Sequence, residues 1–369
     1  QNKKRWVFDI HPQYTIAILA ISKITNTSNE FISLKGPFDS LESFIAGKDS
    51  QSKKFNIADV LNWNESVSLP LMPTTYSSEV FGQLKKSPWL TLNKQNEWRA
   101  RPDGELHATA QKKFMDFSTD RPDGYWPVYK GASFDLWNPD TGVYNAWADP
   151  NELLPWLQNK RVRAHSRSTK SVHKEFSSEY IQNENTLPPL RARIAFRDCS
   201  RATDTRTVRC ALIPPKTFIT NTGPVLMFPR GDEKDEAYLL GVLSSIPLDW
   251  YARRFVENHL NFFILNPFPI PRPSRDNKLW KRIVEISGRL ACTDERFSKW
   301  AKKVGVDYGP LNSDIKQDKI NELDAIVSHL YGLTEKQLIH IFETFHQGWD
   351  YQVRLNEVMK HYFINSEKD

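Results

Sequence analysis

The sequence predicts an α+β protein in which a mixed, β-rich middle with some helices precedes a helical C-terminal region. Short apolar runs between turn residues dominate residues 124–275, which favours strands. After Pro273 the apolar residues recur at three- and four-residue spacing, which favours amphipathic helices. With 369 residues, 12% of them aromatic, the chain is long and apolar enough to bury a full core.

The first segment, residues 1–60, is expected to be the remnant of an α/β sheet. Apolar runs on either side of a turn at residues 11–13 predict strands, and a helix is predicted over residues 38–46 with Gly47 as its cap. A self-contained small β module is the alternative. The chain lacks an initiator Met and a signal-peptide pattern, so we expect a fragment of a longer parent.

Residues 61–123 are expected to be a connector with short helices, one of them over residues 77–86. The next predicted domain, 124–275, opens with a β-hairpin over residues 124–147, whose turn is Asn-Pro-Asp-Thr-Gly. A short helix over 152–158 should then lead into a basic loop, 160–174.

The rest of this domain is predicted from three stretches of sequence. Basic strands are expected over residues 191–209. The segment AYLLGVLSSIPLDWYARRF is apolar and long enough for a buried helix, and HLNFFILNPFPIPRP is expected to be an apolar strand that runs into prolines.

The C-terminal domain, residues 276–369, is predicted to be helical. A capping box formed by Thr334 and Gln337 should start one of its helices. The helix faces expected in the core are Trp280, Ile283, Ile286 and Leu290; Ile320, Leu323, Ile326, Val327 and Leu330; and Leu338, Ile341, Phe342 and Phe345.

Positive charge is concentrated in one part of the chain. The net charge is +6, whereas residues 160–209 alone hold twelve Lys and Arg against five Asp and Glu, so the rest is close to neutral. A concentrated basic segment with interleaved apolar residues favours phosphate binding over a solvated loop. The predicted DNA-binding residues are Lys160, Arg161, Arg163, Arg167, Lys170, Lys174, Arg191, Arg193, Arg197, Arg201 and Arg206.

Several functions are not supported by any motif. No apolar run approaches the ~20 residues that cross a bilayer, and three scattered cysteines form neither a disulfide framework nor a zinc motif. Dinucleotide, P-loop, metalloprotease and hydrolase motifs are absent, so no catalytic or metal-binding residue is predicted. Asp232 and Glu233 could belong to a nuclease site, but a polar turn between strand and helix explains them better. The expected location is cytoplasmic.

Five segments, in order, resemble the C-terminal half of type IIG-like restriction–modification adenine methyltransferases with a TaqI-like specificity domain. They are FDIHPQYTIAILAIS; WPVYKGASFDLW; RDCSRATDTRTVRCALIPP, with Asp204 where Asn is more usual; AYLLGVLSSIPLDWYARRF followed by HLNFFILNPFPIPRP; and ELDAIVSHLYGL followed by LIHIFETF.

The resemblance implies a target-recognition domain over residues 124–275 that binds double-stranded DNA, with the parent's N-terminal methyltransferase domain as a partner. The parent would use S-adenosylmethionine, and Mg²⁺ if it cleaves DNA. The catalytic N-P-P-Y loop and the cofactor motif are not in this chain, so we expect neither methylation nor a cofactor here. Arg206 and Thr207 match a motif of the family, and Thr207 is expected to brace the fold. The alternatives are a metal-dependent nuclease fragment and a protein-interaction module of a phage-defence complex.

Overall fold

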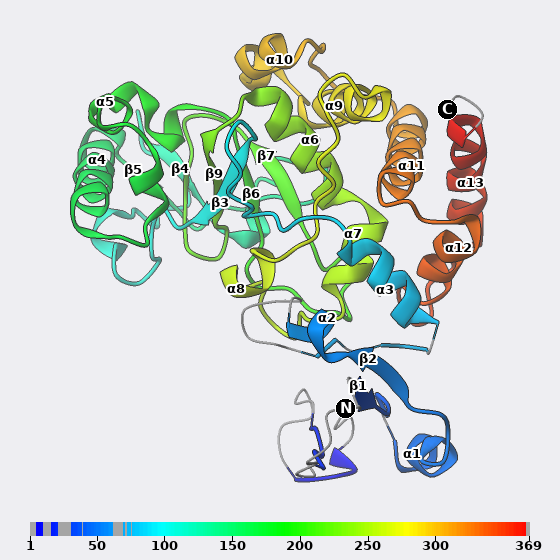
Figure 1. Cartoon of the computed structure of the whole chain (residues 1–369). Helices are drawn as coiled ribbons and strands as arrows, with labels where there is room; N and C mark the ends of the chain where they lie inside the picture. Colours follow the sequence, from blue (N-terminus) through cyan, green and yellow to red (C-terminus); the bar gives the residue numbers. More distant parts are fainter. Residues whose placement is uncertain are drawn as a thin grey trace.

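The structure of this chain is a computed structural model that describes residues 5–9, 16–20, 31–38, 40–61, 69–70, 72–74 and 76–366. Helices and small sheets both occur, and helices dominate the C-terminal part (Figure 1), so the predicted α+β class is confirmed. No described helix is both long and apolar enough to cross a membrane.

A four-stranded antiparallel sheet lies in the middle of the described structure (Figure 1). Its strands in spatial order are β3 (Arg99–Asp103), β9 (Val225–Arg230), β6 (Arg193–Phe196) and β7 (Cys210–Ile213). Successive residues of a strand point to opposite faces, and those of β6 and β7 enter two different cores. Both faces are therefore covered, and every residue of β6 and β7 is buried.

A second, three-stranded sheet has the order β5 (Ala146–Ala148), β4 (Trp126–Tyr129) and β8 (Phe218–Ile219). The pairing of β4 with β5 is antiparallel, which confirms the predicted hairpin, whereas β8 pairs in parallel with β4. The short elements in the chain between β3 and β6 are η2 (Lys112–Phe114), η3 (Gly131–Ser133), η4 (Val172–Glu175), α5 (Ser178–Gln182), η5 (Glu184–Thr186) and η6 (Pro188–Leu190).

Helix α4 (Pro150–Arg167) follows β5 and is much longer than the helix predicted over 152–158. The expectation of a loop from Lys160 onward is wrong for its first eight residues. Residues 156–167 include no Gly and no Pro, and Lys, Arg, Ala and Gln are good helix formers. The first half of the basic segment is therefore presented on a helix.

The segment from 237 to 255, expected to be one buried helix, forms two. Helix α6 (Glu233–Ser244) has Ser245 as its C-cap, and α7 (Ile246–Ala252) begins with Pro247 in its first turn, where proline is tolerated. A Cβ atom at Gly241 would lie 2.2 Å from the Ser287 hydroxyl oxygen, so only glycine allows α6 to pack this closely on the next long helix, α9 (Lys278–Ala291).

The C-terminal helices are α9 (Lys278–Ala291), η7 (Glu295–Phe297), α10 (Ser298–Val304), α11 (Ser313–Leu330), α12 (Glu335–Glu343) and α13 (Gln352–Ser366). The predicted capping box of α12 is confirmed, since Thr334 and Gln337 each accept a hydrogen bond from the other's backbone N–H. The predicted apolar faces are buried except for Ile320 and Leu330, which are half-buried. One core cluster joins these helices to β6 and β7.

The prediction that the apolar segment from 259 to 273 is a strand is wrong. The segment contains the short helix α8 (Phe262–Leu265), after which prolines at alternate positions remove backbone donors. Isolated pairing remains instead, including Leu90 N–H to Phe268 C=O (2.7 Å), Ile270 N–H to Pro88 C=O (2.8 Å) and a bridge between Cys199 and His259.

The N-terminal part contains β1 (Phe31–Leu34) paired antiparallel with β2 (Lys53–Asn56), together with α1 (Leu41–Gly47) and α2 (Ile57–Leu61). The helix predicted over 38–46 is present, with Ser40 as its N-cap and Lys48 as its C-cap. Residues 5–9 and 16–20, predicted as strands, form none, and the turn at 11–13 lies outside the described residues. Helix α3 (Ser77–Lys85) matches the helix predicted over 77–86.

Candidate nucleic-acid interface

Helix α4 separates an apolar face from a basic one. Asp149 caps its N-terminus by accepting a hydrogen bond from the Asn151 N–H at 2.8 Å, and Pro150 occupies the first turn. Leu153 and Leu157 are buried in the core beside the three-stranded sheet. Residues on the opposite side of the helix therefore face solvent.

Four cations of the basic segment are exposed, and none of their side chains makes an ion pair or a hydrogen bond within the described part of the chain. They lie near the end of α4 (Arg163 and Arg167) and around η4 (Lys170 and Lys174). A hydrogen bond between the His165 ring and the His173 carbonyl oxygen (2.8 Å) holds η4 against the last turns of α4. We call these four residues the basic face.

The carboxylate next to the basic face, Glu175, already pairs with two arginines. Glu175 accepts hydrogen bonds from Arg99 and Arg101 of β3, the latter at 2.8 Å. Burial opposes ionisation of Glu175, but the two guanidinium groups outweigh it and hold its pKa below the usual value. Glu175 therefore remains an anion shared by two arginines, and it does not neutralise the lysines beside it.

An aromatic pair lies beside the first half of α4, partly buried against the core next to the three-stranded sheet. The rings of Phe114 and Trp156 lie 5.6 Å apart, and the Lys113 ammonium lies 4.9 Å from the Phe114 ring centre. Trp156 and Arg163 are seven residues apart, which places them on one side of the helix. Nothing in the sequence brings residue 113 to this helix, and the prediction missed it.

Two cations of α4 are structural. The Lys160 ammonium donates to the backbone carbonyls of Gly104 and Glu105. Arg161 is buried and donates to Gln158, the Thr186 hydroxyl (2.9 Å) and the Asn183 carbonyl (2.6 Å). Burial lowers the pKa of Arg161. The prediction that Arg161 binds DNA is wrong, because its buried side chain connects α4 to the segment that follows α5.

The prediction that Arg193 lies at the DNA interface is also wrong. Its side chain is 1% exposed and forms a two-pronged ion pair with Glu105, at 2.6 and 3.0 Å, while donating to the Thr217 carbonyl at 3.0 Å. Burial raises the pKa of Glu105, and the charge of Arg193 opposes that rise. The pair joins the four-stranded sheet to the segment that precedes the second sheet.

Arg206 supports the loop before β7. It donates to Asp249 of α7 and to the Ser244 carbonyl (2.6 Å), and Asp249 is fully buried. Thr207 is buried as well, and its N–H donates to the same carboxylate at 3.1 Å, which confirms that Thr207 braces the fold. Arg253, which the sequence analysis missed, holds this loop through three carbonyl oxygens, of Ala202, Asp204 and Thr205.

The remaining predicted cations do not join the basic face. Arg197 is partly buried, donates to the Phe134 carbonyl and pairs with Asp135 at 3.3 Å. Arg201 is exposed, but its loop contacts α7 and the His346 ring, whereas α4 packs on the three-stranded sheet. The expected single cationic surface from 160 to 209 is thus corrected to a smaller one.

Arg191 is half-buried, and its charge acts on Glu236 of α6. Glu236 is buried and accepts a hydrogen bond from the Trp300 indole N–H at 2.7 Å. Burial raises the pKa of Glu236 to about 6. This carboxyl group is therefore protonated at a higher pH in the folded protein than in the unfolded chain.

We expect Glu236 to make stability depend on pH. The folded state retains this proton above the pH at which the unfolded chain loses it, so the free energy of unfolding falls between pH ~4.5 and ~6 and stays lower above. The decrease from this group should be about 2 kcal/mol. Glu236→Gln should remove it, as measured by urea unfolding at either end of this range. An equal decrease in the variant and the wild type would contradict this role.

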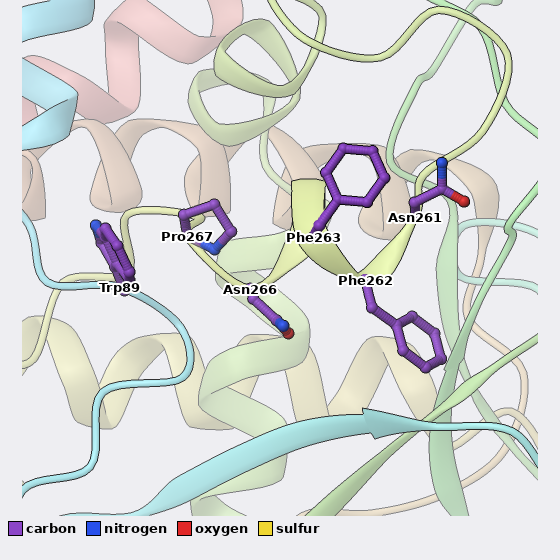
Figure 2. Close-up of a pocket in the computed structure, with 6 residues that line it drawn as sticks. All are labelled: Trp89, Asn261, Phe262, Phe263, Asn266 and Pro267. Carbon is purple, nitrogen blue, oxygen red and sulfur yellow. The ribbon is translucent and has the colours of Figure 1, made fainter. Parts of the chain in front are cut away.

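A second surface feature is an aromatic pocket of about 510 Å³ at α8. Figure 2 shows Trp89 and Pro267 at one end, and the rings of Phe262 and Phe263 pointing in different directions from α8. Both phenylalanines are exposed. An exposed aromatic patch of this kind can contact an apolar or planar partner.

The carboxylates that a nuclease would need have structural roles. Asp232 caps α6 by accepting from the Lys234 and Asp235 N–H groups, and it pairs with Arg275 at 2.8 Å. Glu233 pairs with Lys303. The predicted polar turn between β9 and α6 is confirmed.

The described structure is that of an α+β protein with a basic face at the end of α4 and around η4. Comparison with known proteins finds no matching family model and no matching curated protein.

Proposed function

We propose that this chain is a DNA-binding, target-recognition fragment and that the basic face contacts the phosphate backbone of a duplex. One observation carries the proposal: the side chains of Arg163, Arg167, Lys170 and Lys174 are exposed and have no partner among the described residues, although most arginines of the same segment are paired inside the fold. Unpaired cations retain their full charge for an external anion.

The charges of the basic face suit a polyanion. Arg163 and Arg167 are four residues apart on α4, which places them ~6 Å apart along its axis and on one side of it, and duplex DNA presents one negative charge per ~1.7 Å. Arginine can grip a phosphate with two parallel hydrogen bonds, while lysine adds charge with less directional demand. Trp156 and Phe114 add apolar contact beside them. These contacts position DNA, and they assign no base-reading residue.

The wider setting in the proposal comes from the resemblance of the five segments. The parent would be a cytoplasmic adenine methyltransferase of a restriction–modification system, with S-adenosylmethionine bound by its N-terminal domain. In that setting this chain holds the target for a catalytic domain outside it. A protein-interaction role is the second candidate, favoured by the exposed aromatic pocket at α8.

Titration of the protein with a labelled duplex at two salt concentrations tests the proposal. If the protein contacts four phosphates, a rise in salt from about 50 to about 200 mM should weaken binding by roughly 100-fold. Fluorescence anisotropy gives both dissociation constants. The absence of binding to any duplex at the lower salt concentration would contradict the proposal, and binding of a partner protein at the aromatic pocket would then favour the second candidate.

A further inference from the structure

The structure brings three metal-ligating side chains together at a place that the sequence does not single out. Asp198 and Cys199 follow β6, and His259 lies sixty residues later, before α8. Two backbone hydrogen bonds join the segments, from Leu260 N–H to the Asp198 carbonyl (2.7 Å) and from Ser200 N–H to the Asn258 carbonyl (3.1 Å). The side chains between these bonds are therefore held in register.

The three donor atoms converge on one point. His259 Nδ1 lies 2.9 Å from Asp198 Oδ2 and 3.8 Å from Cys199 Sγ, and Sγ lies 4.0 Å from the same Oδ2. Zinc bond lengths and tetrahedral angles give donor separations of about 3.4–3.6 Å. Each observed separation is within about half an ångström of that range. Among the described residues, no other group of three His, Cys, Asp or Glu side chains is gathered so closely.

We propose that Asp198, Cys199 and His259 form a binding site for a divalent metal ion of borderline softness, with Zn²⁺ as the expected occupant. Thiolate and imidazole select zinc over calcium or magnesium, which prefer oxygen ligands alone. Cys199 and His259 are exposed, so the fourth position is open to water or to an external donor.

The same three residue types could instead form a nucleophilic cysteine site, but the geometry is against it. In such a site one imidazole nitrogen contacts the thiol while the other is held by the carboxylate. Here a single nitrogen, Nδ1, faces both partners. Burial, with the charge of Asp198, raises the pKa of the Cys199 thiol.

The metal would tie the loop after β6 to the segment before α8. The sequence analysis predicted no zinc site because the three cysteines are far apart along the chain. Here a single cysteine is joined by a histidine and a carboxylate from two separate segments, which no local motif reveals.

Cobalt substitution tests this site, since Co²⁺ bound to a thiolate gives a charge-transfer absorption band. We expect the reduced, chelator-treated protein to show this band on titration with Co²⁺ and to lose it when Zn²⁺ is added. Cys199→Ser should abolish the band, and His259→Ala should weaken Co²⁺ binding at least ~10-fold. Circular dichroism should show both variants folded, because both side chains are exposed.

His361→Ala is the matched control. His361 is half-buried and pairs with the exposed Asp318 at 2.8 Å, so the two form a histidine–carboxylate pair outside the proposed site. Its loss should leave the band unchanged. The proposal is overturned if the wild type gives no band, or if the band persists in Cys199→Ser, because Cys210 or Cys292 would then be its source.

Discussion

Reversing two charges of the basic face, Arg163→Glu with Arg167→Glu, should weaken duplex binding at least tenfold at moderate salt. Both side chains are exposed and have no internal partner among the described residues, so the change replaces two attractions to phosphate by two repulsions. The loss should be similar for duplexes of different sequence, since phosphate contacts carry no base information. Fluorescence anisotropy with two unrelated duplexes measures it.

A charge-matched control separates local contact from net charge. Lys299→Glu with Lys302→Glu changes the net charge by the same amount on α10, which lies away from α4 (Figure 1). We expect it to change affinity much less than the α4 pair. Equal losses from the two pairs would mean that only net charge matters, and unfolding of the α4 pair would mean that those arginines are structural.

Arg193→Ala, in contrast, should greatly lower the free energy of unfolding. It removes the partner of Glu105, which is 4% exposed and would remain buried without its cation. Breaking a buried pair in this way typically lowers the free energy of unfolding by about 3–5 kcal/mol. Urea unfolding followed by circular dichroism measures the change.

Arg163→Ala is the control for this prediction, because it comes from the same basic segment but is exposed. Its free energy of unfolding should change by no more than about 0.5 kcal/mol. If the two variants were equally stable, the ion pair between the sheet and residue 105 would not hold the fold as described.

The C-terminal helices were the most predictable part of this fold. The apolar stripe of α9 and the capping box of Thr334 and Gln337 are local patterns, so the sequence alone indicates them. The strand predicted from 259 to 273 failed for an equally local reason. Its prolines remove the donors that a sheet ladder needs, although its apolar residues look like those of a strand.

The binding face was only partly predictable, because exposure depends on partners far along the chain. Alternation of Arg191 and Arg193 with apolar residues is typical of a strand with one solvated face. Strand β6 is instead interior to its sheet and covered on both sides, and Arg193 meets a carboxylate 88 residues earlier. The charge count of a segment therefore overstates its surface charge.

The salt dependence of duplex affinity tests the central claim most directly, when the wild type is compared with the Arg163→Glu and Arg167→Glu protein. If these two arginines contact phosphates, the slope of log affinity against log salt should be shallower by about 2 in the variant. An unchanged slope would show that DNA, if bound at all, lies elsewhere on the molecule.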